Sequence, residues 1–557
     1  MKTNQRLIYL PLGGANEIGM NMYLYGYGVP GAENFILVDV GVAFPDMNTS
    51  PGVDLIMPDI SFIEENKDRL LGIFITHAHE DHIGALGHLI ANLNAPIFCR
   101  KFSAQIAFSK LDKVGNSGSD IRIVDTYPKK IKLGPFQISF APISHSIPES
   151  SILVIDNPVG RIIHTGDFKI DKTPVLGDWF DQNLLMEINK KEVLAIVCDS
   201  TNVFSEGPGR SESSLVTDIT NLIKSKKGAV VATTFASNVA RLLTLAKSAQ
   251  SAGRSVLVVG RAMQTMISAA SSVGLLTDFP TTLSMEDALC LPRSNLFILA
   301  TGSQGEGRAA SAQLAREKFM DLVLQEGDTF LFSSKTIPGN ELAVSKVVNN
   351  FMKRGIDVID DQDGKYHVSG HANKPDLIYL HELFSPALIV PMHGEPRHLR
   401  EHQKVAKAQR FNSVTVYNGS ILEIRSNGSA QIVDEVPAGQ VYYDGGKLIK
   451  AGDGIVKTRL QMATRGHLSV SILLEKNTIM DNGIWVKSKG LPRNKEDKFE
   501  VEGILEEALE MELLNVEGTD FYDDDLIESL TKRVCSRMCQ KLIKKKPVIT
   551  IFINRVK

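Results

Sequence analysis

Cysteine is scarce in this sequence, and no stretch of it is apolar over the length of a membrane span. The 557 residues include five cysteines, and none of them forms a CxxC pair. An odd number of scattered cysteines argues against a disulfide framework and against a cysteine zinc site. No run approaches the roughly 18 apolar residues that cross a membrane, and the opening MKTNQRLIYLPLGG lacks the apolar core of a signal peptide. We therefore expect a cytoplasmic protein without a membrane anchor.

The chain also lacks the excess of basic residues that nucleic-acid-binding proteins usually carry. Its formal net charge is -3, with 43% hydrophobic and 22% charged residues, values of an ordinary soluble globular protein. Bulk charge does not exclude a local basic groove, and bound metal ions would add positive charge where they sit. A chain of this length exceeds what one hydrophobic core supports, so we expect two or three domains.

Short apolar runs that end in a polar or glycine-containing turn recur along the first part of the chain. Examples are FILVD (35–39), GIFIT (72–76), RIIHTGD (161–167) and AIVCDS (195–200), with amphipathic stretches between them. This alternation of strands and helices is typical of α/β proteins. An Asp or His follows almost every run, so polar side chains are expected at the strand ends.

In the middle block, residues 206–375, expected strands and helices alternate more regularly. Its expected strands AVVATT, SVLVVG, LFILATG and TFLFSS are separated by helical stretches such as NVARLLTLAKSAQ. The pattern predicts a mostly parallel sheet with helices on its faces. After it, LIYLH (377–381) and LIVPMHGE (388–395) return to strands followed by a histidine. The middle block therefore looks like an insertion into the first domain.

The last part of the chain predicts a small α+β module. Residues 435–454 carry clustered glycines and fit a linker or a small strand pair. From residue 456, two strands precede an acidic helical stretch (494–515), a further helix and a final strand, PVITIFINRV. The expected order is a first core segment, the insertion, the returning core, a linker and the C-terminal module: 1–205, 206–375, 376–430, 431–455 and 456–557.

A cluster of metal-ligand residue types lies where the strand GIFIT gives way to a helical stretch: His77, His79, Asp81 and His82. Imidazole and carboxylate together suit zinc or a similar divalent ion. His77 and His79 can converge on one ion, and Asp81 and His82 can serve a second, as in two-metal hydrolytic sites. The alternative, a solvated loop with an accidental run of histidines, is disfavoured because HxHxDH directly after a strand is a specific pattern.

The HxHxDH motif resembles the signature of the metallo-β-lactamase superfamily, and three further residues follow in the order of that family. His145 follows the strand FQISFAP, Asp167 ends RIIHTGD, and Asp39 ends FILVD. The resemblance implies that His145 completes the first metal's ligands and that Asp167 bridges both metals. It implies that Asp39 orients a ligand without binding metal itself. Each of these residues, taken alone, could equally be structural.

Three later motifs resemble motifs A, B and C of the β-CASP nucleases: Asp199 in CDST, His371 in VSGHA and His393 in PMHGE. The resemblance implies that His393 ligates the second metal. His371 would contact the scissile phosphate or the leaving oxygen, Asp199 would support the site, and Asp81 would join them in catalysis. A histidine at motif C is the form associated with RNA-cutting members.

The inserted block offers hydroxyl, amide and backbone donors of the kind that a 5′-phosphate pocket needs. The candidate substrate-binding residues there, besides His371, are Ser237, Asn238, Ser369 and Gly370. The alternative for Ser237 and Asn238 is capping of the helix that follows them. The loop 301–308 could also hold a phosphate, and its Arg308 either contacts RNA or pairs with a surface acid. It lacks the GK[ST] ending of a P-loop, so we reject a nucleoside triphosphatase.

Over nearly its whole length, from LGGANEIGMN (12–21) onward, the chain resembles the ribonuclease J family. The implied fold is a metallo-β-lactamase αββα sandwich with an inserted β-CASP parallel α/β domain and a small C-terminal α+β domain. The implied activity is 5′-to-3′ exonuclease cleavage of single-stranded RNA, preferring a 5′-monophosphate, together with endonuclease cleavage.

The same resemblance implies a role in mRNA turnover and in maturation of ribosomal and other stable RNA. It implies two divalent metal ions, Zn²⁺ in the first place with Mn²⁺ or Mg²⁺ as alternatives, and a homodimer or homotetramer. Two alternatives stay open at this point: a small-molecule hydrolase of the same fold and a non-catalytic RNA-binding paralogue.

Overall fold

The computed structural model describes residues 5–116, 120–360, 364–476, 478–492, 500–516 and 522–556. Contacts within the chain divide it into two units. The first unit is Met1–Ala43 with Met57–Gln440, and the second is Phe44–Ile56 with Val441–Lys557. Residues 1–4 of the first expected domain and 494–499 of the expected acidic helix lie outside the described residues. Within the described ranges, no helix combines the length and the apolar character needed to cross a membrane.

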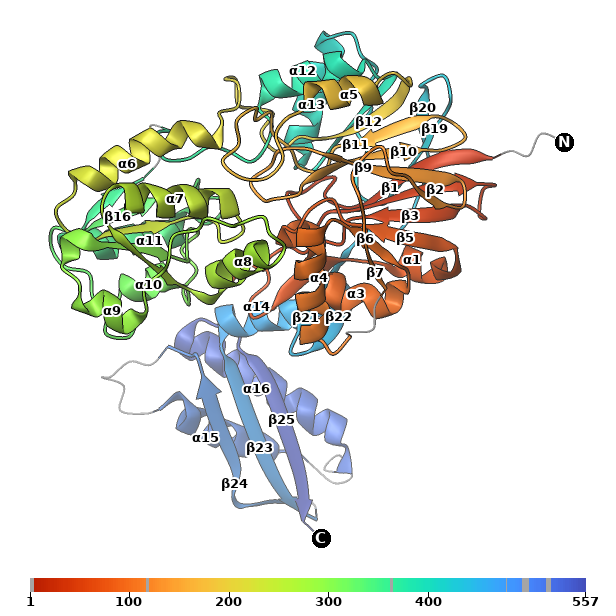
Figure 1. Ribbon diagram of the computed structural model, residues 1–557. Coiled ribbons are helices and arrows are strands. Elements are labelled where there is room, and N and C mark those ends of the chain that lie inside the picture. Colours follow the sequence, from red (N-terminus) through yellow and green to blue (C-terminus); the bar gives the residue numbers. More distant parts are fainter. Residues whose placement is uncertain are drawn as a thin grey trace. The chain divides into compact units, whose positions relative to one another are not determined.

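The first unit contains two large sheets that lie beside the inserted block (Figure 1). In spatial order, the larger sheet consists of β20 (Ala430–Glu435), β19 (Ser420–Ile424), β1 (Arg6–Gly13), β2 (Met22–Gly28), β3 (Asn34–Val38), β5 (Leu70–Phe74), β6 (Ile97–Cys99) and β7 (Ile121–Ile123). The smaller sheet consists of β18 (Leu388–Met392), β12 (Val193–Asp199), β11 (Arg161–His164), β10 (Ser151–Asp156), β9 (Phe136–Pro142) and β8 (Ile131–Leu133).

The inner faces of these two sheets pack against each other. Tyr9 and Tyr23 of the larger sheet share one buried core with Phe136 and Phe140 of the smaller sheet. The outer face of the smaller sheet is covered by α5 (Gln182–Ile188), α12 (Lys374–Phe384) and α13 (Pro396–Ala408), which bury Leu185, Leu377 and Val405 in a second core. Strands covered on both faces need apolar side chains throughout, which explains the uninterrupted run of β12.

Helices beside the larger sheet complete the layers (Figure 1). They are α1 (Ser61–Glu65), α2 (Glu80–Ile83), α3 (Leu86–Leu93) and α4 (Lys101–Lys113). The order of layers is helix, sheet, sheet, helix, so the expected αββα sandwich is confirmed.

The inserted block forms a five-stranded sheet in which every pairing is parallel. In spatial order its strands are β14 (Ser255–Val259), β15 (Leu296–Ala300), β13 (Val230–Thr233), β16 (Thr329–Phe332) and β17 (Asp357–Ile359). One face is buried against α6 (Val216–Ser225), α7 (Val239–Ser251) and α8 (Arg261–Ser272). The other is buried against α9 (Met285–Cys290), α10 (Ala310–Leu314) and α11 (Glu341–Met352). The predicted parallel α/β insertion is therefore confirmed.

The insertion leaves and rejoins the smaller sheet at neighbouring strands. The chain departs after β12 and returns at β18, which pairs with β12 in parallel and places Asp199 opposite Met392. The expectation that LIYLH is a strand is wrong, because residues 377–381 lie inside α12. Asn373 and Asp376 form a capping box at the start of this helix, and the apolar residues of the segment face the smaller sheet.

Most residues of the two three-stranded sheets belong to the second unit. The glycine-rich segment is a strand pair, β21 (Gln440–Asp444) and β22 (Lys447–Lys450), and β21 also pairs with β4 (Leu55–Pro58). The helix α14 (Ile455–Arg465) leads to a sheet of β24 (Thr478–Lys489), β23 (His467–Glu475) and β25 (Val548–Val556). One face of that sheet packs on α15 (Val501–Leu513) and α16 (Asp524–Ile543), whose Cys535 and Cys539 are buried free thiols.

Candidate metal centre and active site

The candidate site lies where the parallel strands of both sheets end. Asp39 follows β3 and Thr76 follows β5, which are parallel neighbours. In the other sheet, Asp199 closes β12 and His393 follows β18, again parallel neighbours. Carboxyl ends of parallel strands meet at one edge of a sheet, so residues far apart in sequence come together there.

His77, His79, His145 and Asp167 bring one ligand atom each within 4.8 Å of one another. The Nδ1 atom of His79 lies 3.1 Å from Nε2 of His77 and 3.1 Å from Nε2 of His145. The Gly370 carbonyl, 2.6 Å from Nδ1 of His145, can only accept a hydrogen bond, so Nε2 of His145 carries a lone pair. Several imidazole lone pairs aimed at one point are the donor set that a divalent cation requires.

The protonation states of His77, His79 and His145 agree with metal binding. Burial lowers the pKa of His77 and of His145 well below the usual range, and it lowers the pKa of His79 to about 4. All three imidazoles are therefore neutral near neutral pH, and the neutral imidazole is the form that binds a metal.

A second group consists of Asp81, His82, Asp167 and His393. Nε2 of His82 lies 3.2 Å from Oδ2 of Asp167, and Nε2 of His393 lies 3.4 Å from Oδ2 of Asp81. Asp167 is common to both groups, with its Oδ1 2.7 Å from Nδ1 of His393. A carboxylate in this position can serve two metal ions at once.

Asp39 holds this part of the site together without facing either group. Its carboxylate accepts hydrogen bonds from Thr76 N and Thr76 Oγ1, both at 2.8 Å, and from Nδ1 of His82 at 2.7 Å. The bond from His82 leaves its Nε2 as the metal-facing atom. Asp39 is fully buried and has φ 62, a backbone conformation that Asp tolerates better than most residues. This placement fits a residue that orients a metal ligand.

Asn21 is a site residue that the sequence did not single out. Its Nδ2 lies 2.9 Å from Nε2 of His82 and 3.3 Å from Nε2 of His393, while its Oδ1 accepts from Tyr23. The only signal was its position at the end of LGGANEIGMN, directly before the strand β2.

His371 enters the site from the loop that follows the inserted sheet. Its Nδ1 lies 2.7 Å from Oδ2 of Asp199 and 3.8 Å from Oδ2 of Asp167. Burial acts to lower the pKa of His371, but the two carboxylates outweigh it, and the pKa is raised. Asp199 is itself held by Thr201, whose N and Oγ1 donate to its Oδ1 at 2.9 and 2.7 Å. This His–Asp pair can carry a proton beside the candidate metal ligands.

The expected phosphate-binding residues fall into two places. Ser369 and Gly370 lie at the site, because Ser369 Oγ accepts from His371 N at 3.1 Å and the Gly370 carbonyl contacts His145. Asn238 caps α7 through its Oδ1, which accepts from Arg241 N at 2.9 Å, and Ser237 beside it is half-buried. No hydrogen bond among the described residues joins Ser237 or Asn238 to the loop of His371.

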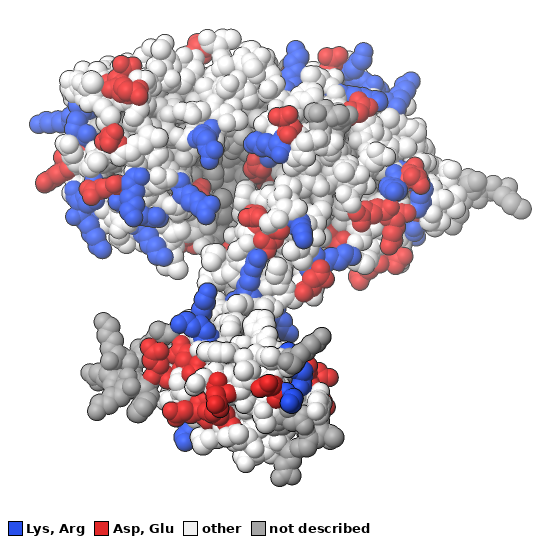
Figure 2. Space-filling model, turned by 90° about the horizontal axis from the view of Figure 1, so that it is seen from below, with Lys and Arg blue, Asp and Glu red and all other residues white. Residues whose placement is uncertain are grey.

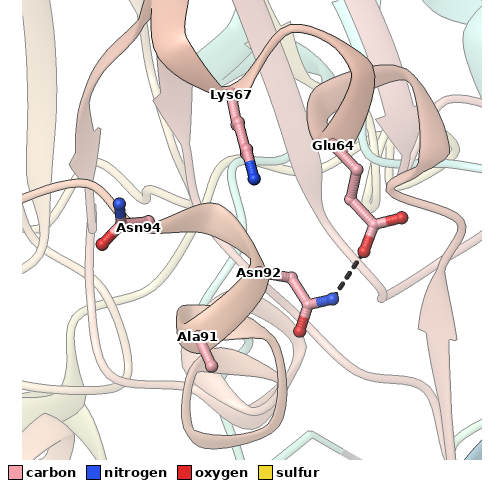
Figure 3. A pocket seen from close by; sticks show the side chains of 5 residues that line it. All are labelled: Glu64, Lys67, Ala91, Asn92 and Asn94. Carbon is pink, nitrogen blue, oxygen red and sulfur yellow. Dashed lines mark hydrogen bonds between the residues drawn. The ribbon is translucent and has the colours of Figure 1, made fainter.

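Arg308 lies apart from the candidate metal ligands, on a loop that lines a pocket of the inserted domain. It has no ion-pair partner within the described parts of the chain. The surface carries both signs of charge, and Figure 2 shows Lys and Arg side chains at the edge of a hollow on the face that it presents. A second pocket, formed by Glu64, Lys67 and the end of α3, is a polar surface hollow in which Asn92 donates to Glu64 at 2.5 Å (Figure 3). It contains none of the candidate site residues.

His381 and His402 form a separate buried cluster with Cys198. Ser200 Oγ donates to Nδ1 of His402 at 2.8 Å, and Nε2 of His402 lies 3.0 Å from Nε2 of His381. Nδ1 of His381 in turn donates to Oε1 of Gln409 at 2.9 Å. Every ring nitrogen of the two histidines is occupied by this hydrogen-bonded chain, so we assign it a structural role.

Comparison with known proteins places the chain in a family. Four family models match it: Metallo-beta-lactamase superfamily (residues 21–196), Ribonuclease J, beta-CASP domain (227–351), Zn-dependent metallo-hydrolase RNA specificity domain (364–417) and Ribonuclease J C-terminal domain (454–556). These matches cover the larger part of both sheets of the sandwich, the inserted sheet and the C-terminal module.

Curated relatives agree. Ribonuclease J of Sinorhizobium meliloti is 37% identical over 558 residues, covering 100% of this chain and 98% of the relative. Ribonuclease J2 of Bacillus subtilis is 31% identical, covering 85% of each chain. A crystal structure of a protein of unknown function from Enterococcus faecalis has a TM-score of 0.52 at 17% identity, covers 75% of this chain and 100% of that one, and supports the fold alone. The chain therefore belongs to the ribonuclease J family and is a metal-dependent ribonuclease.

Proposed function

We propose that this ribonuclease hydrolyses single-stranded RNA at a site with two divalent metal ions, first of all Zn²⁺. His77, His79 and His145 would hold one ion, Asp81, His82 and His393 the other, and Asp167 would bridge them. The observation that carries the proposal is the pair of ligand groups that share Asp167. When bound, the two ions would lower the pKa of a water molecule and neutralise charge on the phosphate.

In this proposal His371 acts on the leaving oxygen. Its Nδ1 is engaged by Asp199, so the proton that it can transfer is the one on Nε2. The Asp199 carboxylate favours the protonated imidazole, which is the form that a general acid needs. Transfer of this proton would yield a 3′-hydroxyl on the departing strand, and the incoming water oxygen would remain on the 5′-phosphate of the other product.

We further propose that the enzyme degrades RNA from the 5′ end, prefers a 5′-monophosphate and also cuts internally. Ser237, Asn238, Ser369 and Gly370 would bind the terminal phosphate beside His371, with Arg308 binding RNA elsewhere. The placement of Ser369 and Gly370 next to His145 and His371 supports this assignment. We assign the protein to mRNA turnover and stable-RNA maturation in the cytoplasm, acting as a homodimer or homotetramer.

The test is digestion of single-stranded RNA labelled at the 5′ end. Monophosphorylated and triphosphorylated forms, matching DNA and an EDTA control are compared with added zinc, manganese or magnesium. Early release of labelled mononucleotide from the monophosphate form, weak on the triphosphate form and blocked by EDTA, is the expected result. Internal fragments alone would remove the exonuclease and the terminal-phosphate pocket from the proposal.

A matched pair of variants tests the pocket itself. Ser369→Ala should lower the ratio of cleavage rates on monophosphate and triphosphate RNA. Ser225→Ala, at the exposed end of α6, should leave this ratio unchanged. Equal ratios in Ser369→Ala and the wild type would remove Ser369 from the pocket.

A further inference from the structure

A pocket of the inserted domain opens at the carboxyl end of its parallel sheet. It encloses about 460 Å³ and is lined by the loops that follow β13, β14 and β15. These strands are neighbours in the order β14-β15-β13. Ligands of open parallel α/β sheets bind at this edge. None of the candidate metal ligands lines the pocket, so it is separate from the metal centre.

Unused hydrogen-bond donors line the pocket. Thr234 and Ser303 are 1% and 3% exposed, and the Thr234 hydroxyl has no hydrogen-bond partner among the described residues. The backbone N–H groups of Gly302 and Ser303 also have no partner in the described ranges. Buried polar groups are costly unless they are paired, so this arrangement points to a ligand that accepts hydrogen bonds.

Glycine keeps the strand ends close together at this edge. Gly260 has φ 116, and a Cβ atom there would lie 2.3 Å from Oγ1 of Thr301 on the neighbouring strand end. Gly302 has φ 110, and its Cβ would lie 2.0 Å from Oγ of Ser311. Both positions therefore require glycine, which leaves the backbone of the two turns open to a ligand.

The charge at the pocket favours an anion. Arg261 begins the 12-residue helix α8, and Arg261 and Arg308 both line the pocket without an ion-pair partner in the described chain. The one carboxylate that lines it, Glu306, accepts a hydrogen bond from Gln304 N at 3.0 Å. Two unpaired guanidinium groups, a helix N-terminus and the unpartnered hydroxyl of Thr234 together suit a phosphate group.

We propose that this pocket binds a backbone phosphate of the RNA substrate away from the cleavage site. The enclosed volume exceeds that of a single phosphate and admits an attached nucleotide. One wall, Thr234 to Ala236, continues directly into Ser237 and Asn238, so RNA held here would lie beside that loop. The inference rests on the ribonuclease activity and not on the direction of cleavage.

The test measures binding of a fluorescent single-stranded RNA with phosphorothioate linkages, which keep the charge and resist hydrolysis. The full-length, metal-loaded wild type is compared with the double variant Arg261→Gln/Arg308→Gln. Loss of hydrogen bonds to a charged group should weaken binding by about tenfold or more. Loss of one phosphate contact should also lower the slope of log K against log salt by about 0.7. Arg425→Gln, an exposed arginine of β19–β20 that pairs with Glu423, should change neither quantity.

A second variant avoids any change in net charge. Thr234→Val removes the unpartnered hydroxyl at constant shape, and it should weaken RNA binding several-fold with an unchanged salt slope. Unaltered affinity and slope in the double variant would overturn the proposal.

Titration of inorganic phosphate distinguishes a pocket for free phosphate from a pocket for a backbone phosphate of RNA. If the double variant loses affinity for inorganic phosphate and keeps its affinity for RNA, the pocket takes a free phosphate and the proposal is wrong. Failure of the proposed exonuclease activity would show in the cleavage assay and would leave the binding result intact.

Discussion

Arg241 and Glu212 form a two-pronged ion pair inside the inserted domain. Nε and Nη2 of Arg241 lie 2.5 and 2.8 Å from the two carboxylate oxygens of Glu212, and the two side chains are 0% and 4% exposed. Nη1 of Arg241 also donates to the carbonyls of Ser333 and Tyr366. Because Tyr366 begins the segment that carries Ser369 and His371, the pair anchors the loop that brings His371 to the site.

Glu212 also contacts a loop of the metallo-β-lactamase sandwich. Its backbone N–H donates to Oδ2 of Asp171 at 3.1 Å, and the same oxygen lies 2.8 Å from Nζ of Lys169. Lys169 and Asp171 follow Asp167 in the chain. One buried network therefore connects the loop of a candidate metal ligand with the inserted domain.

Removing Arg241 should destabilise the protein and impair cleavage. In Arg241→Ala the Glu212 carboxylate stays buried without its partner, which costs about 3 to 5 kcal/mol of unfolding free energy. Urea denaturation followed by circular dichroism measures the shift, and Arg425→Ala at the surface should stay within about 0.5 kcal/mol of the wild type. A wild-type midpoint in Arg241→Ala would show that the network carries no stability.

The metal content of variants should distinguish the metal ligands from His371, the proposed general acid. His79→Ala and Asp81→Ala should lose both bound metal and RNA cleavage. His371→Ala should keep its metal while cleavage falls by roughly 10² to 10⁴, the usual contribution of a positioned acid. Mass spectrometry of the dialysed proteins gives metal per chain. Equal metal loss in all three variants would mean that His371 is a ligand.

Asp39 should raise metal affinity by orienting His82, although it is not itself a metal ligand. Asp39→Asn keeps an acceptor for Thr76 N but presents an amide toward Nδ1 of His82, so His82 loses its orientation. We expect metal affinity to fall by about 10- to 100-fold, measured by competition with a chromogenic chelator. Asp120→Asn, an exposed carboxylate paired with Arg122, is the matched control. Unchanged affinity in Asp39→Asn would contradict the orienting role.

Buried neutral histidines should make the fold sensitive to mild acid. Burial lowers the pKa of His381 to about 4 and that of His367 to about 3. Between these values and the ordinary pKa of about 6.5, the unfolded chain binds protons that the folded chain does not. Stability should therefore fall as the pH falls through this window, by about 1.4 kcal/mol per pH unit for each group.

His381→Gln tests the sign of this effect. Glutamine keeps a polar side chain but does not titrate, so the dependence of unfolding free energy on pH between about 4 and 6.5 should become shallower. A steeper dependence in His381→Gln would reverse the assignment.

Much of the candidate metal centre was predictable because its chemistry is local. His77, His79, Asp81 and His82 lie in one turn after an apolar strand, and such a turn can direct them to one region whatever the rest of the chain does. The alternation of strands and helices likewise indicated the parallel insertion. The prediction of a strand for LIYLH was wrong because short apolar runs suit a strand or a buried helix equally. The capping box of Asn373 and Asp376 favours the helix.

The sequence by itself determined the residue types of the candidate metal centre and the place of the parallel insertion, since both follow from short motifs and local periodicity. Tertiary structure alone decided that Asn21 faces His82 and His393, that Arg241 pairs with Glu212 and that Arg261 joins Arg308 at one pocket. These contacts join segments that are distant along the chain, and only the packing of the sheets and helices brings those segments side by side.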